Sequence, residues 1–302
     1  MAKMFKYASR ALVVALCLMV PGAADIASAK FNPAGQTNPP KKKKLPPGAK
    51  GFEQFADRDA SDKLVTGGAT RGQCETYEQL IECAMGQAGS TPPNIKEATG
   101  FFMQAAKLKP EMFRPQYNLG QIYESQGNYK EAAAAYKLAL TLKIDESMEE
   151  TPASVTSAQF NLGNVYAQMN DHAQAIATFK EVIRLLPEPY HTPHYNLGLS
   201  LAALGKQQEA ITSFNEAIKI KPDYWEAHYN QGLAYSKSER YVEAIIAFKK
   251  ALENNADYAP AQYNLGLVYY LTDDSKGVAE MVKALEKTKP DMAKELAKLN
   301  GK

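Results

Sequence analysis

The chain has 302 residues, of which 45% are hydrophobic and 23% charged, and its formal net charge is only +2. Its first 29 residues hold three basic residues and one acidic residue, which leaves 32 residues of each sign in the rest of the chain. This balance argues against a nucleic-acid-binding protein, because such proteins usually carry a strong basic excess.

The N-terminus has the pattern of a secretory signal peptide over residues 1–29. Lys3, Lys6 and Arg10 precede ten apolar residues at 11–20, and an Ala-Ser-Ala triplet ends at Ala29, where we predict cleavage. Ten apolar residues are too few for a membrane span, which needs about 20, so we expect no stable span. The mature protein is expected in the periplasm, with secretion beyond it as the alternative.

Residues 30–72 are rich in proline, glycine and lysine and poor in apolar residues. This composition predicts a disordered, partly extended linker. Its four consecutive lysines, Lys41–Lys44, would contact an anionic surface weakly, at roughly 1 kcal/mol for each lysine. The simpler interpretation is a solubilising tether.

Two cysteines, Cys74 and Cys83, remain once the signal peptide is removed. An even pair in an oxidising compartment predicts a disulfide, which would join the end of the linker to the first helix. The spacing is not that of a metal or redox motif.

One four-residue string occurs five times between residues 117 and 266. It consists of an aromatic residue, asparagine, leucine or glutamine, and glycine, and it occupies residues 117–120, 160–163, 195–198, 229–232 and 263–266. The glycine advances by 43, 35, 34 and 34 residues. A fixed period in this range is the signature of a repeat array.

Each string is followed at fixed spacing by an apolar, a small and an aromatic residue, which in the first copy are Tyr123, Ala132 and Tyr136. Over roughly residues 113–290 this pattern resembles the tetratricopeptide repeat (TPR). The resemblance implies an all-α fold, a right-handed α-solenoid of about five helix hairpins. Arrays of this kind usually bind partners and seldom carry out chemistry.

The leucine and glycine of each string fall on one helical face, which therefore packs against the rest of the repeat. Glycine inside a helix costs ~1 kcal/mol relative to alanine, so its recurrence implies a close backbone approach. We expect that approach to be to the small residues of the second helix. Gly127, Asn170, Gly205 and Glu239 lie in segments predicted to be the turns between the two helices.

The array has irregular edges. Upstream, residues 73–112 match half of a repeat, and Gly86 falls at the glycine position, which predicts a degenerate N-terminal repeat. Downstream, the fifth copy is one residue short, and Gly277 and Met281 take the small and aromatic places. Residues 291–302 are predicted to be a capping helix and tail, because terminal repeats are usually atypical.

Nine extra residues, around 147–155, separate the first two full copies, and several acidic residues lie in or near them. We predict a longer second helix followed by a solvated loop. The alternative is an acidic docking site for a basic partner.

The aromatic residue and the asparagine of each string lie opposite the packing face. By the resemblance, this opposite face lines the concave groove of the superhelix. An amide both donates and accepts hydrogen bonds, so an asparagine ladder would bind a peptide backbone, as in the TPR region of glycosyltransferases of the O-GlcNAc class. The alternative is structural, with each asparagine bonded to the neighbouring repeat. The predicted groove residues are Tyr117, Asn118, Gln121, Phe160, Asn161, Asn164, Tyr195, Asn196, Leu199, Tyr229, Asn230, Leu233, Tyr263, Asn264 and Leu267.

The sequence contains no phosphate loop, no dinucleotide-binding turn and no nucleophile elbow. Its four histidines are His172, His191, His194 and His228, of which His194 and His228 fall on the packing face. His191 and His194 are three residues apart, but no further ligand is evident beside them. We therefore predict no enzymatic activity, no metal and no cofactor.

These features predict an exported adaptor that binds peptide segments or protein partners in its groove, in cell-envelope assembly or secretion. One alternative is a self-assembling oligomeric scaffold. Another is an accessory subunit of an envelope enzyme.

Overall fold

The computed structural model describes residues 74–90, 93–144, 152–186 and 188–300. The predicted signal peptide and linker, and the acidic residues 145–150, lie outside this part of the chain. The described residues form thirteen α-helices. In chain order these are α4 (Tyr77–Ala88), α5 (Ile95–Leu108), α6 (Phe113–Ser125), α7 (Tyr129–Ala139), α8 (Pro152–Gln168), α9 (His172–Leu185), α10 (His191–Ala203), α11 (Gln207–Ile220), α12 (Trp225–Lys237), α13 (Tyr241–Asn254), α14 (Ala259–Leu271), α15 (Ser275–Thr288) and α16 (Pro290–Asn300).

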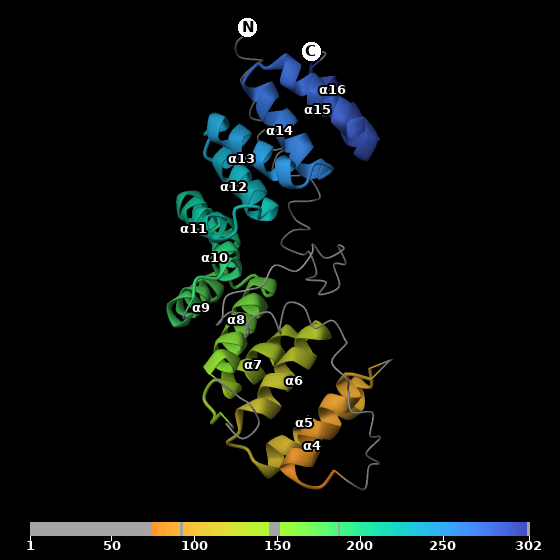
Figure 1. Ribbon diagram of the computed structural model, residues 1–302, viewed down its shortest axis with the longest axis vertical. Coiled ribbons are helices and arrows are strands. Elements are labelled where there is room, and N and C mark those ends of the chain that lie inside the picture. The colour runs from red at the N-terminus through yellow and green to blue at the C-terminus, as the bar shows by residue number, and fades with distance from the viewer. Residues whose placement is uncertain (1–73, 91–92, 145–151, 187, 301–302) are drawn as a thin grey trace. The chain divides into compact units, whose positions relative to one another are not determined.

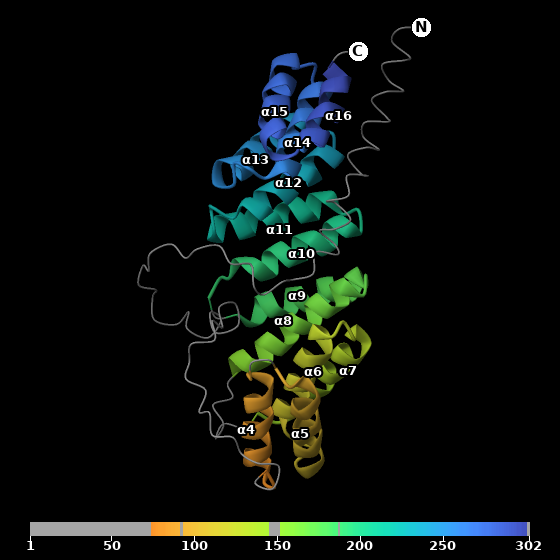
Figure 2. The same ribbon diagram turned by 90° about the vertical axis from the view of Figure 1, so that its right-hand side faces the viewer.

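The helices pair in chain order into hairpins, and the hairpins belong to two compact units (Figure 1). The N-terminal unit contains α4–α9 and the C-terminal unit contains α10–α16. Within the C-terminal unit, Figure 2 shows successive helices stacked in layers from α10 onward. The all-α solenoid of helix hairpins predicted from the repeat is confirmed.

Each turn inside a full hairpin is made by one residue in the left-handed region. Gly127 and Gly205 have φ of 75°, and Asn170, Glu239 and Asp273 have φ of 58°, 57° and 61°. Glycine and asparagine adopt this conformation most readily, whereas other residues meet a steric cost of about 1–2 kcal/mol. The turn positions agree with those predicted from the sequence.

The repeat glycine of each of the first four full hairpins faces an aromatic ring of the second helix. A Cβ atom at Gly120, Gly163, Gly198 or Gly232 would lie 2.5–2.7 Å from the nearest ring carbon. The four rings belong to Tyr136, Phe179, Phe214 and Phe248, and all are fully buried. The predicted approach to small residues was therefore wrong: the missing side chain makes room for a ring.

The last hairpin solves the same packing problem differently. Met281 takes the aromatic place, and a Cβ at Gly266 would clash with a methyl group of Leu296 on α16. Gly277, at the small position of α15, lies against the ring of Tyr269. The predicted capping helix therefore fills the space that a ring occupies in the other hairpins.

The hairpin α4–α5 packs without a repeat glycine. No atom lies within 4 Å of a Cβ built at Gly86, so this glycine does not serve the predicted role. Tyr77 and Ile81 on α4 and Phe102 on α5 form its buried core instead. Cys74 and Cys83 are joined by a disulfide with a Cα–Cα distance of 6.5 Å, which confirms the predicted pairing.

The prediction of a longer second helix before the acidic insertion was wrong. Helix α7 ends at Ala139, whereas α8 has 17 residues and is the longer helix. The backbone after α7 pairs instead with the segment before α6. The Lys143 amide donates to the Glu111 carbonyl at 2.8 Å, and the Phe113 amide donates to the Lys143 carbonyl at 2.9 Å.

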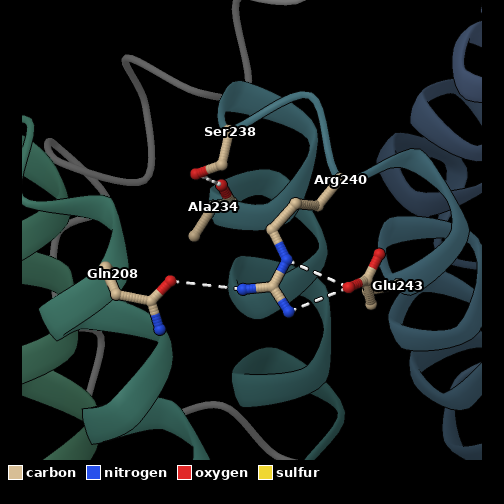
Figure 3. Close-up of polar contacts among 5 residues, drawn as sticks. All are labelled: Gln208, Ala234, Ser238, Arg240 and Glu243. Carbon is tan, nitrogen blue, oxygen red and sulfur yellow. Dashed lines mark hydrogen bonds and ion pairs between the residues drawn. The ribbon is translucent and has the colours of Figure 1, made fainter.

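Arg240 connects two consecutive hairpins of the C-terminal unit (Figure 3). Its guanidinium donates to Gln208 of α11 at 3.2 Å and to Glu243 of α13 at 2.8 and 3.0 Å. It also lies 4.7 Å from the ring centroid of Tyr235. Arg240, which is the N-cap residue of α13, therefore holds the start of α13 against the start of α11.

The contact between glycine and ring predicts opposite outcomes for two glycine-to-alanine substitutions. Gly198→Ala should destabilise the chain by about 1–3 kcal/mol, because the Phe214 ring has to move. Gly86→Ala should stabilise it by up to ~1 kcal/mol, because helix propensity improves without a clash. Urea unfolding followed by circular dichroism measures both. Equal effects of the two substitutions would contradict this account of the glycine.

Candidate partner-binding face

The predicted groove residues lie on the first helices of the hairpins, on a surface that we call the Tyr–Asn face. Its N-terminal half lies on α6 and α8, and its C-terminal half on α10, α12 and α14. The two halves belong to different compact units.

In the N-terminal half, several polar groups are bonded within their own helix. The Asn118 amide donates to the Arg114 carbonyl at 3.0 Å, and the Gln121 amide donates to the Tyr117 hydroxyl at 3.1 Å. Tyr117 itself is buried. Phe160, Asn161 and Asn164 on α8 are half-buried, so part of each side chain is accessible to a partner.

In this unit, buried Tyr136 forms a polar pair with half-buried Glu124. The Tyr136 hydroxyl donates to the Glu124 carboxylate at 2.7 Å. Burial raises the pKa of Glu124, and the hydrogen bond from Tyr136 opposes that rise. This hydrogen bond is specific to the first full repeat, because the next three repeats have phenylalanine, which lacks a hydroxyl, at the position of Tyr136.

In the C-terminal half, asparagine bonds one repeat to the preceding repeat. Asn230 donates to the Tyr195 hydroxyl at 3.0 Å and to the Glu226 carbonyl at 2.8 Å. Asn264 donates to the Tyr229 hydroxyl at 3.1 Å and to the Pro260 carbonyl at 2.9 Å. These bonds give asparagine a structural reason to occupy a helix interior, and they match the structural alternative. Peptide binding by the asparagines stays a prediction.

Access to the C-terminal half decreases toward α14. Tyr195, Asn196, Leu199 and Leu233 are half-buried. Tyr229, Asn230, Tyr263, Asn264 and Leu267 are buried, with exposed fractions of 8% or less. A partner can therefore reach the part of the face on α10 and at Leu233 of α12 more readily than the part on α14.

A second tyrosine series, which the sequence analysis missed, borders this half. Tyr190, Tyr224 and Tyr258 are the N-cap residues of α10, α12 and α14. They are 34 residues apart, so the same period that revealed the repeat could have revealed them. The corresponding residues of the first two full repeats are Met112 and Val155, so the series is confined to the C-terminal unit.

Two of these N-cap tyrosines, Tyr224 and Tyr258, pack against tyrosines of the preceding repeat. The Tyr224 ring centroid lies 4.9 Å from that of Tyr195, and the Tyr258 centroid lies 5.0 Å from that of Tyr229. Tyr258 is also 4.5 Å from Trp225. We call Tyr195, Tyr224, Trp225, Tyr229 and Tyr258 the aromatic ladder. Each such ring pair stabilises the fold by about 0.5–1.5 kcal/mol, in addition to the free energy gained by burying the apolar area of the rings.

His191 and His228 are held by packing and hydrogen-bond contacts within the structure. His191 lies 5.0 Å from the Tyr190 ring and 4.8 Å from the Tyr224 ring, and burial lowers its pKa to about 4. His228 is buried, with its ring bonded to the Pro222 carbonyl at 2.9 Å. His194 is half-buried. Among the described residues there is no group of three or more histidine, cysteine, aspartate or glutamate side chains suited to hold a metal ion.

No helix in the described part of the chain is both long and apolar enough to cross a bilayer.

Family models of the tetratricopeptide repeat match three segments of the chain, residues 111–188, 198–239 and 225–258. No catalytic family is among these matches. No curated protein matches the sequence.

Several solved structures are similar to this chain. YrrB, described as a TPR protein with an unusual peptide-binding site, is 24% identical over 65% of this chain and 97% of its own, with a TM-score of 0.53. Pseudomonas aeruginosa PilF is 16% identical over 73% of this chain and 96% of its own, with a TM-score of 0.55. MamA from Desulfovibrio magneticus is 23% identical over 58% of this chain and 93% of its own, with a TM-score of 0.50. At these identities the likeness shows the fold alone.

The bond between Asn264 and Tyr229 predicts an energetic coupling between repeats. Asn264→Ala and Tyr229→Phe should each lower the free energy of unfolding, and a double-mutant cycle should give a coupling of about 0.5–1.5 kcal/mol. Asn254→Ala is the matched control, because Asn254 bonds only the carbonyl four residues earlier, that of Lys250. Additive effects of the two substitutions would contradict the inter-repeat bond.

The raised pKa of Glu124 predicts a pH-dependent stability. A carboxyl group whose pKa is higher in the folded state stabilises the fold most when protonated, and this stability is lost as the pH rises through the folded pKa. Glu124→Gln, which is neutral at every pH, should therefore melt at a higher temperature than the wild type at pH 7. The gap should close as the pH falls toward the ordinary glutamate value of about 4.3. Glu131→Gln on the exposed face of α7 is the control. A lower melting temperature for Glu124→Gln at pH 7 would show that the bond to the charged carboxylate dominates.

Proposed function

Because this chain belongs to the tetratricopeptide repeat family, we propose that it is an exported adaptor that holds peptide segments of partner proteins on its Tyr–Asn face. Its setting would be cell-envelope assembly or secretion. The observation that carries this proposal is the composition of the accessible part of the face. Half-buried Tyr195, Leu199 and Leu233 offer apolar area beside the amide of Asn196.

Such a surface suits an extended peptide. Apolar side chains of the peptide would cover the leucines, and its backbone would meet amide groups that both donate and accept hydrogen bonds. Asn161 and Asn164 offer similar amides on α8 of the N-terminal unit. The peptide-binding site for which YrrB is described lends support to this use of the fold.

Two features support the exported location. The N-terminal sequence has the charge, apolar run and small-residue triplet of a signal peptide. The disulfide between Cys74 and Cys83 suits an oxidising compartment, where such bonds form and persist.

Site-specific photo-cross-linking in exporting cells tests the proposal. A photoreactive residue at Leu199 or Leu233 should capture a partner, whereas the same residue at exposed Thr212 on α11 should not. In the same cells, the mature chain should begin at Lys30. Equal capture from Leu199 and Thr212 would contradict a role for the face. A cross-link from the face to a second copy of this chain would support the self-assembling scaffold instead.

A further inference from the structure

Glu226 is an acidic residue that the repeat itself does not require. It is the second residue of α12, and the equivalent residues of the other full repeats are Arg114, Ser157, Thr192 and Pro260. Its backbone carbonyl accepts the bond from Asn230, but any residue provides that carbonyl. Helix packing alone therefore does not explain a carboxylate at this position.

The charge of Glu226 is unpaired within the described part of the chain. The first-turn glutamates of the neighbouring helices are exposed or paired: Glu209 lies 3.4 Å from Lys206, and Glu243 lies 2.8 Å from Arg240. Glu226 is half-buried and takes part in no such ion pair. Burial raises the pKa of Glu226. A hydrogen bond from its own backbone amide and the charge of Lys221 oppose that rise, and Asp223 adds to it.

The surroundings of this carboxylate are aromatic. Its charge acts on the hydroxyls of Tyr195, Tyr224 and Tyr258, three members of the aromatic ladder. These three tyrosines and Trp225 are half-buried, so each keeps part of its surface accessible. The faces of tyrosine and tryptophan rings attract cations, and the attraction strengthens when water is excluded. The chain itself shows such a contact here, with the Lys221 ammonium 5.2 Å from the Tyr224 ring centroid.

From this charge complementarity we infer that Glu226, Tyr195, Tyr224 and Tyr258 form a subsite for a basic side chain, a lysine or arginine, carried by the peptide segment of a partner protein. The inference rests on the proposed function and names the chemistry of the peptide. An incoming cation would pair with the carboxylate and lie against the rings. Leu199 and Leu233 would contact apolar side chains of the same segment.

A divalent cation is a poorer match than a basic side chain. Calcium takes about six to eight oxygen ligands, several of them carboxylates or carbonyls, and magnesium is usually bound by one or two carboxylates together with phosphates and waters. This subsite offers one carboxylate, and no cluster of three potential ligands occurs among the described residues.

The chain carries its own reporter for the subsite. Trp225 is the only tryptophan in the sequence, it precedes Glu226, and its ring lies 4.5 Å from that of Tyr258. Its fluorescence should therefore respond when a ligand enters the subsite. The probes are short capped peptides that differ only in a central lysine, arginine or norleucine, each flanked by leucines.

The exported full chain should bind the lysine and arginine peptides about 10-fold more tightly than the norleucine peptide, equivalent to about 1.4 kcal/mol. Glu226→Gln should remove this preference while leaving the circular dichroism spectrum unchanged. Glu286→Gln, at an exposed position on α15, should keep the preference and is the matched control.

Each contrary outcome has a separate meaning. Equal binding of the lysine and norleucine peptides would overturn the basic subsite but leave the adaptor function standing. Binding of none of the peptides would also overturn the subsite, and the adaptor function would then depend on cross-linking at Leu199. The basic peptides could also bind only after Lys41–Lys44 are all replaced by glutamine. The lysines of this chain would then be the occupant of the subsite, and the inference of a partner would be wrong.

Discussion

The contact between a repeat glycine and an aromatic ring is the constraint on which the first four full hairpins depend. A single added methyl group at Gly120, Gly163, Gly198 or Gly232 would enter the space of a fully buried ring. Because protein interiors are close-packed, this contact sets how near the two helices of a hairpin come. The hairpins at the two ends lack this contact. The α4–α5 hairpin has a core of tyrosine and phenylalanine, and in the α14–α15 hairpin Leu296 of the capping helix lies against the repeat glycine.

Contacts between hairpins are less uniform, and they distinguish the two compact units. In the C-terminal unit, each asparagine of α12 and α14 bonds a tyrosine hydroxyl of the preceding repeat, and N-cap tyrosines pack against those same tyrosines. In the N-terminal unit, Asn118 bonds its own helix. The hydroxyl of buried Tyr136 donates to half-buried Glu124 and is also hydrogen-bonded by Asn161 of the next repeat. Stacking of repeats is thus achieved by different chemistry along one array.

This difference bears on the proposed function. Asn230 and Asn264 are buried, so they are poorer candidates for peptide contacts than the half-buried Asn196 or the half-buried asparagines of α8. Leu199, Leu233 and every member of the aromatic ladder except Tyr229 are half-buried, so these side chains keep accessible surface. Glu226 lies beside that ladder, and its carboxylate forms no ion pair with any other described residue.

The sequence by itself determined the period, the hairpins, the turn positions and the separation of a packing face from a Tyr–Asn face. These follow from residue spacing, because 3.6 residues per helical turn fixes which side chains share a face. Only the tertiary structure decided what each face touches. That the glycine meets a ring, that Gly86 meets nothing, and that Asn264 reaches Tyr229 depend on the rotation and offset of one helix against another. Those quantities arise from the packing of whole side chains between helices, and a pattern along one helix does not record them.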